Sequence, residues 1–279
     1  DGLEEYGLLD EVLDELRDIH QGPSGAVASL PRRVGERIAR IRRSGRLPMA
    51  GLGQRSERAL VDTLVPMLER WSTLYAQYPE PAQKEPLRFD HEGLVLDDWL
   101  DGLRLDSPES GQPVWLELLP TRLCEKGKPL VIPQKLISAW VRTLVASACG
   151  APVQGMMVGR DATVTVEAMP ADQARASLRI LLDAWREGMG APLPLASKTA
   201  LAWLAGANAE QVYEGGMFVS VEVSEACLSR MFPDYEALTA DGRFETLAES
   251  LFGPLASWAR THVAARLHSA PGAFESEPA

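Results

Sequence analysis

The chain has 279 residues, of which 46% are hydrophobic and 24% charged, a composition typical of an ordinary soluble protein with a substantial core. Its 28 Lys and Arg stand against 39 Asp and Glu, and the net charge of −11 excludes a surface that binds nucleic acid all over, leaving only a local basic patch. Arg142 interrupts the best apolar run before it reaches the length of a membrane span, so no span is predicted.

The start of the chain and its cysteines bear on its origin. The sequence begins at Asp1, without an initiator Met or a signal peptide, so we expect one part of a longer polypeptide. Cys124, Cys149 and Cys227 lie far apart and form no CxxC pair, which favours a reducing, cytoplasmic location.

Residues 1–80 are predicted to form a helical N-terminal region, because apolar residues recur there at helical spacing. The two stripes consist of Val34, Ile38 and Ile41 and of Leu60, Leu64, Met67, Leu68, Trp71, Leu74, Tyr75 and Tyr78. Pro66 falls inside the second stripe, where its ring and missing N–H predict a kink or a later start of the helix. A Gly/Pro-rich loop is predicted between the stripes, over residues 44–53.

Strands are predicted next. Residues 79–86, "PEPAQKEP", contain three prolines and no large apolar residue, and are predicted to be a linker. A mixed α/β domain is expected from there over residues 87–270. Its predicted elements are short strands around 87–89, 94–100, 100–106 and 114–119, a helix around 136–145, and a hairpin over 153–170 that turns near 159–161.

The last third is predicted to be rich in helices. One helix begins after Pro170, and its core stripe is formed by Ala174, Leu178, Leu181, Leu182 and Trp185. It is predicted to end at "GMGAP", where Gly188 or Gly190 supplies a left-handed cap and Pro192 stops the helix. A break is expected at the glycines 215 and 216, and residues 271–279 are predicted to be a disordered tail.

Motifs for common chemistries are missing from the sequence. It contains neither GxxxxGK[ST] nor GxGxxG, which excludes a nucleotide-driven motor within this chain. The histidines form neither HxH nor HExxH, and there is no GxSxG or Cys with a nearby His, so the sequence predicts no metal, no cofactor and no nucleophile.

The acidic residues Asp101 and Glu117 form a partial nuclease pattern. Divalent-metal nucleases place an Asp and a Glu on adjacent strands to hold Mg²⁺, and a Lys two residues after the second carboxylate orients the attacking water. Leu119 occupies that position here, and the nearest lysines, Lys126 and Lys128, fall in a predicted loop. Because the ligand set is incomplete, we favour solvent-facing acids at strand ends over a metal site.

A basic segment at residues 31–46 carries seven Arg against Glu36 alone. Contacts with DNA phosphates or with an acidic partner are predicted for Arg33, Arg37, Arg40 and Arg43. The alternative is a solvated helix whose arginines pair with the protein's own carboxylates. Residues 207–250 contrast with it, since their nine Asp or Glu against two Arg make a poor nucleic-acid surface and a plausible protein-facing one.

Three stretches together resemble a known family. They are "RSGRLPMAGLG" at 43–53, "WREGMGAPLPLASKTALAWL" at 185–204 and "YEGGMF" at 213–218. In matching order they resemble the C-terminal region of the RecC family, the gamma subunit of exodeoxyribonuclease V. None of them is a chemical signature, so the specificity lies in the set.

The resemblance implies a piece of a heterotrimeric helicase–nuclease that processes double-strand breaks for recombination. Its C-terminal domain is expected to be a restriction-endonuclease-like, inactive nuclease fold, a mixed sheet flanked by helices with helical additions at both ends. If Asp101 and Glu117 occupy the old acidic positions, Leu119 replaces the Lys. The implied partners are a RecD-type alpha subunit, which the domain docks, a RecB-type beta subunit, which holds the nuclease, and double- and single-stranded DNA.

Two other functions stay open from the sequence. One is an active Mg²⁺-dependent nuclease that uses Asp101 and Glu117 with a Lys recruited from elsewhere. The other is a stand-alone DNA-binding module built on the arginine-rich segment, whose affinity would depend steeply on salt.

Overall fold

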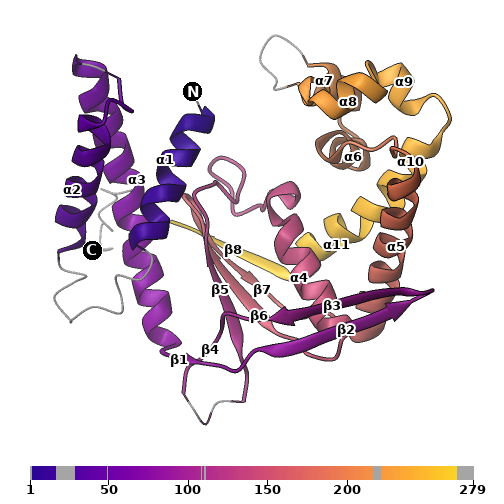
Figure 1. Cartoon of the computed structure of the whole chain (residues 1–279), viewed down its shortest axis with the longest axis horizontal. Helices are drawn as coiled ribbons and strands as arrows, with labels where there is room; N and C mark the ends of the chain where they lie inside the picture. The colour runs from indigo at the N-terminus through magenta and orange to yellow at the C-terminus, as the bar shows by residue number, and fades with distance from the viewer. Residues whose placement is uncertain are drawn as a thin grey trace, which may run out of the picture.

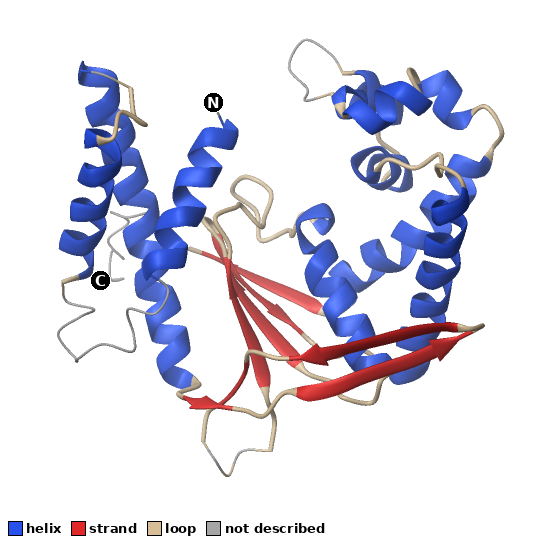
Figure 2. Ribbon diagram, viewed as in Figure 1, coloured by secondary structure: helices blue, strands red, loops and turns tan. Residues whose placement is uncertain are grey.

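The protein is described from a computed structural model that covers residues 2–16, 29–48, 50–107, 109, 111–215 and 221–268. Three N-terminal helices stand on one side of a central mixed sheet, and the C-terminal helices stand on the other side (Figures 1 and 2). None of the helices in these ranges is both long and apolar enough to span a membrane. The predicted tail at 271–279 lies outside the described residues.

The predicted N-terminal helices are confirmed. Their bounds are α1 (Gly2–Leu16), α2 (Leu30–Arg43) and α3 (Ala50–Gln77). The first predicted stripe is buried, since Val34, Ile38 and Ile41 are at most 2% exposed. They pack with apolar side chains of α1 and α3, such as Leu9 and Leu64, in one cluster. Each helix therefore buries the face that its sequence periodicity marks out.

The loop predicted at 44–53 is too long. Helix α3 already begins at Ala50, and Pro66 lies inside it, so the predicted later start is also wrong. Packing explains the first difference: a Cβ on Gly53 would lie 2.0 Å from the carbonyl oxygen of Pro48. The glycine permits a close approach of two backbone segments and does not mark a loop.

The main sheet has six strands in the order β1-β4-β5-β6-β7-β8. Their bounds are β1 (Glu80–Pro81), β4 (Leu103–Leu105), β5 (Val114–Leu118), β6 (Gln154–Val158), β7 (Ala162–Val166) and β8 (Val263–Leu267). Only β5 and β6 are parallel, and the crossover between them contains a 3₁₀ turn (Pro133–Leu136) and α4 (Ile137–Ala148). The prediction of a mixed sheet flanked by helices, with a hairpin formed by β6 and β7, is confirmed.

The segment predicted to be a linker, residues 79–86, holds strand β1 and the start of β2 (Glu85–His91). Strand β2 pairs with β3 (Leu94–Leu100) in a two-stranded sheet of its own, separate from the main sheet. The tight turn between them uses Glu92 and Gly93, both at positive φ. The linker prediction missed both pairings because each partner strand lies further along the chain.

The two faces of the main sheet are covered unequally. Helices α4, α5 (Ala171–Gly190) and α11 (Gly253–Thr261) cover one face, where Trp115 and Trp258 are fully buried. On the other face Trp71 and Leu74 of α3 pack against Val158 of β6. Strands β7 and β8 border an open groove on that second face.

The C-terminal helices pack around a core of their own. In chain order they are α6 (Ser197–Leu204), α7 (Ala209–Glu214), a 3₁₀ turn (Glu222–Ser224), α8 (Ala226–Met231), α9 (Tyr235–Thr239), α10 (Arg243–Leu247) and a π-helix (Ala248–Phe252). Tyr213, Leu238 and Phe244 are fully buried there. The helix-rich prediction is confirmed, but strand β8 was missed. The predicted glycine break coincides with the end of α7, where Gly215 adopts a φ of 90°; Gly216 is outside the described residues.

The end of α5 differs from its prediction in two ways. The helix does stop before Pro192, but Gly188 and Gly190 are helical without positive φ, and Ala191 ends the helix in an extended conformation. Trp185, predicted to belong to the core stripe, is 56% exposed. Helix α5 packs mainly against α4, which covers only part of the stripe, and Trp185 lies beyond the covered part.

Candidate functional site

Asp101 and Glu117 lie at the same end of neighbouring strands. Strands β4 and β5 pair with Leu103 opposite Trp115, and the paired segment ends there. Asp101 precedes Leu103 by two residues and Glu117 follows Trp115 by two. The antiparallel register therefore brings Asp101 and Glu117 to the same end of the paired strands. Asp101 is exposed, and Glu117 is half-buried.

Apolar and polar side chains surround Glu117. It lines a cavity of about 580 Å³ together with Trp71 and Leu119 and with the charged residues Asp10 and Arg104. Burial raises the pKa of Glu117, and Arg142 opposes that shift. A raised pKa disfavours the ionised form of the carboxylate, which is the form that binds Mg²⁺.

The cation that lines this cavity is Arg104, and no Lys is among the described lining residues. Arg104 is already engaged, since its Nε donates to the carbonyl oxygen of Tyr78 at 2.6 Å and its two terminal nitrogens donate to Tyr75 Oη and to the carbonyl oxygen of Pro79. Its charge therefore serves to hold the end of α3 against β4.

One group in the described part of the chain has the spacing of metal ligands: His91, Glu92 and Asp183. Asp101 and Glu117 do not belong to it. Nε2 of His91 lies 2.8 Å from Oδ1 of Asp183, and Arg186 lies 3.0 Å from Glu92 and 3.8 Å from Asp183. Arg186 supplies the positive charge that these acids need, so the group is an ion-pair network that ties the β2–β3 turn to α5.

The arginine-rich segment forms helix α2 and the turn after it. Arg37 is directed at α1, where its guanidinium lies 2.6 Å from both Glu11 and Glu15, and its side chain is only 16% exposed. Arg46 also pairs with Glu11, at 2.6 Å. Arg37 therefore pairs with the protein's own carboxylates, which is the alternative that the sequence had left open for these arginines.

The remaining arginines predicted to make contacts are Arg33, Arg40 and Arg43. All three are exposed, and none has an ion pair within the described ranges. They stay available for DNA or a partner, which remains a prediction.

An apolar surface that sequence reasoning missed lies at the end of α5. Trp185 and Met189, one helical turn apart, are 56% and 71% exposed. Leu193 folds back beside Gly188 and, with Pro192 and residues of α8, lines an adjoining apolar groove of about 480 Å³. The sequence feature that could have indicated this exposed surface is the position of Trp185 next to two charged residues near the end of a helix.

The comparisons with known proteins agree with the resemblance seen in the sequence. The search of curated proteins found no match. A family model described as the RecC C-terminal domain matches residues 1–208, which cover the N-terminal helices, β1 to β7, α4, α5 and α6. The chain therefore belongs to the RecC C-terminal domain family.

Proposed function

We propose that this chain is a non-catalytic domain of the gamma subunit of an exodeoxyribonuclease V-type helicase–nuclease. It docks the RecD-type motor subunit and helps to guide or split DNA during double-strand-break repair by recombination. Membership in the RecC C-terminal domain family implies a role in a RecBCD-type complex. The finer assignment depends on the surface of the domain.

The observation that carries the docking proposal is the exposed apolar surface at the end of α5. Trp and Met are enriched at protein interfaces, and here Trp185 and Met189 stand side by side with the apolar groove at Leu193. Covering them would remove apolar surface from water, which favours association. We assign this surface to the motor subunit.

The surroundings of Glu117 support the non-catalytic part of the proposal. A nuclease of this kind needs ionised carboxylates and a cation to orient water. Burial instead raises the pKa of Glu117, and Leu119 stands where the nuclease pattern places Lys. As part of the same proposal, we infer that the sheet descends from a restriction-endonuclease-like nuclease fold.

Docking is tested with the purified chain and the purified RecD-type subunit by titration calorimetry. The double variant Trp185→Ser/Met189→Ser should weaken binding by at least about tenfold, as expected for a central apolar contact. Leu52→Ser, which changes a 66% exposed leucine on α3, is the matched control and should not alter affinity. If the folded wild-type chain does not bind, or if both variants behave alike, the docking proposal is wrong.

A DNA cleavage assay of the same preparation addresses catalysis. Linear DNA incubated with the chain and Mg²⁺ should remain intact. Metal-dependent cleavage that Glu117→Ala abolishes would overturn the non-catalytic assignment in favour of the nuclease alternative.

A further inference from the structure

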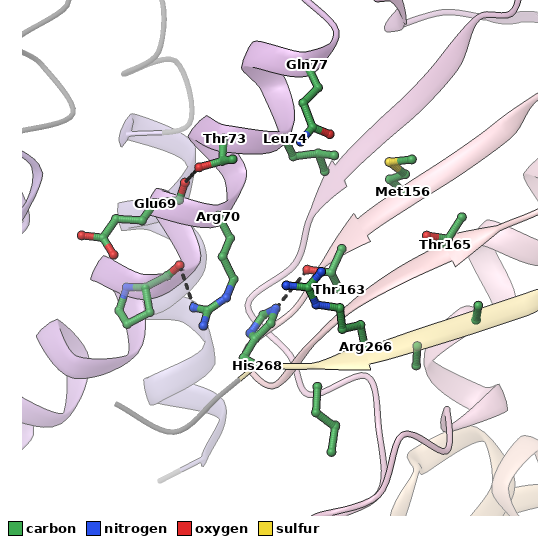
Figure 3. A pocket seen from close by; sticks show the side chains of 14 residues that line it. Glu69, Arg70, Thr73, Leu74, Gln77, Met156, Thr163, Thr165, Arg266 and His268 are labelled. Atoms are coloured by element: carbon green, nitrogen blue, oxygen red, sulfur yellow. Dashed lines mark hydrogen bonds between the residues drawn. The ribbon is translucent and has the colours of Figure 1, made fainter. Parts of the chain in front are cut away.

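A groove of about 770 Å³ lies between α3 and the second face of the main sheet (Figure 3). One wall comes from α3, and the floor comes from β6, β7 and β8. Its described lining mixes apolar side chains with polar ones, and the charged or titratable residues among them are Glu69, Arg70, Arg266 and His268. This groove belongs to neither the Glu117 cavity nor the apolar surface of α5.

Two guanidinium groups converge in the groove. Arg70 reaches from α3 toward the sheet, and Arg266 reaches from β8 toward it, as Figure 3 shows. Arg70 donates to the carbonyl oxygen of Pro66 at 3.0 Å, but neither arginine forms an ion pair with a carboxylate of the described chain. Burial and the nearby charge of Arg266 lower the pKa of Arg70, while Glu69 opposes the shift.

His268 adds a third nitrogen-bearing side chain at the same place. Its Nε2 lies 3.0 Å from Oγ1 of Thr163, while Nδ1 is buried and makes no hydrogen bond of ordinary geometry to the described residues. Two like charges that lie close together form an arrangement that an anion would stabilise, because it would supply the counter-charge.

The cationic surface continues past His268. A second cavity, of about 380 Å³, shares Arg70 and His268 with the first and extends to Arg122 and Arg160. Two carboxylates line it too: Asp62 is exposed, and Asp161 accepts the backbone N–H of Leu123 at 2.8 Å and lies 3.5 Å from Arg122. The two cavities together form a continuous track with several guanidinium groups along it.

We infer that this α3–β8 groove binds successive phosphates of a single DNA strand, with Arg70 and Arg266 as the principal contacts. The inference rests on the proposed role in guiding DNA. A string of phosphates matches a track better than one small anion does, because the arginines are spread over two adjoining cavities. No Phe, Tyr or Trp is among the described lining residues, so we expect the contacts to be made to the backbone and to carry no sequence preference.

The test measures the fluorescence anisotropy of a labelled oligothymidylate titrated with the intact chain at several salt concentrations. Arg70→Gln and Arg266→Gln should each weaken binding by about five- to tenfold and reduce the salt slope by about 0.7, the value for one lost phosphate contact on a single strand. Arg260→Gln, which removes one charge from an exposed site on α11, is the matched control and should leave both quantities unchanged. Thermal melting verifies that each variant is folded.

Several results would overturn the inference. They are an absence of oligonucleotide binding, equal effects of the groove and Arg260 variants, and a loss of binding caused instead by Arg33→Gln or Arg40→Gln on α2. Inorganic phosphate and a polyglutamate peptide are tested as competitors: if either binds the groove and the oligonucleotide does not, the site serves a small anion or an acidic protein segment. Calorimetry with the motor subunit keeps the two proposals apart, since Arg266→Gln should not alter docking.

Discussion

Glu222 is a buried carboxylate that caps a helix from a distant part of the chain. It is 7% exposed, and its two oxygens accept the backbone N–H groups of Lys198 and Thr199 at 3.0 and 2.8 Å and the hydroxyl of Thr199 at 2.8 Å. These N–H groups belong to the first turn of α6, which has no helical acceptor for them. The carboxylate also complements the positive end of the helix dipole.

Glu222→Ala should therefore lower the free energy of unfolding by about 2–3 kcal/mol, because it leaves buried donors without acceptors. Urea denaturation followed by circular dichroism measures the change. Glu225→Ala, at an exposed position three residues further on, should change stability by less than about 0.5 kcal/mol. Equal losses in the two variants would rule out the capping role.

His268 gives the protein a pH dependence with a definite sign. Burial, reinforced by the charge of Arg70, lowers the pKa of His268 to about 4. The unfolded chain protonates this imidazole near pH 6.5, so between about pH 6.5 and pH 4 the unfolded state binds a proton that the folded state does not. Stability contributed by neutral His268 is thus present above pH 6.5 and is lost as the pH falls through this window.

The limit for one proton is about 1.4 kcal/mol per pH unit. Denaturation at pH 7 and at pH 5 should show a smaller pH-dependent loss in His268→Asn than in the wild type, since other titrating groups are common to both. An identical loss in the two proteins would mean that His268 titrates normally in the folded state.

At the scale of elements, the parallel pair β5–β6 is built around a glycine. Gly155 stands opposite Trp115 in the register, and a Cβ at this position would lie 2.0 Å from the indole ring. Trp115 is fully buried, and Arg142 lies over its ring at 5.2 Å from the centroid. The indole therefore fills the space that a side chain on β6 would need.

Gly155→Ala should destabilise the protein by about 1–3 kcal/mol through overpacking, although alanine suits a strand better than glycine does. Gly111→Ala, where a Cβ meets nothing within 4 Å, provides the comparison and should be nearly neutral. Both are read from thermal melts. A stable Gly155→Ala protein would show that the indole can move aside.

The elements that were predicted correctly are those with a local cause. The stripe of Val34 and Ile38, the β6–β7 hairpin and the stop before Pro192 all depend on residues within a few positions of one another. Strands β1 and β8 were missed because their pairing partners are far away in the sequence: Glu80 pairs with Leu105, 25 residues later, and Val263 pairs with Val166, 97 residues earlier. Short edge strands depend on tertiary contacts.

At the scale of the whole molecule, the candidate sites also divide into those that local sequence could predict and those that depend on tertiary contacts. The Asp101, Glu117 and Leu119 pattern could be found from the sequence, because strand ends and spacing are local information. The partners of Arg37 and the exposure of Trp185 could not, since each depends on which helix packs against which. The groove of Arg70 and Arg266 combines residues that lie 196 positions apart in the chain, so no local sequence pattern predicts it.

The charge distribution follows from this packing. The chain carries a net charge of −11, yet part of the positive charge of helix α2 pairs with acids of α1. Arg70 and Arg266, which form no ion pair in the described part of the chain, lie in the groove between α3 and β8. An acidic protein can therefore hold a groove lined by arginines. The net charge determines its electrostatic field at long range, whereas a few nearby residues determine the contacts within the groove. Overall charge is a poor guide to where this protein meets a phosphate.

The last turns of α5 limit how the chain can change in length. Three consecutive residues have three different surroundings: Trp185 is exposed, Arg186 lies 3.0 Å from Glu92, and Glu187 pairs with Arg243. Each residue of an α-helix is rotated by about 100° from the one before it. Inserting or deleting one residue within α5 would turn all three side chains away from their neighbours together, whereas many substitutions would disturb only one. Natural variants of this domain should therefore differ in the composition of α5 far more readily than in its length.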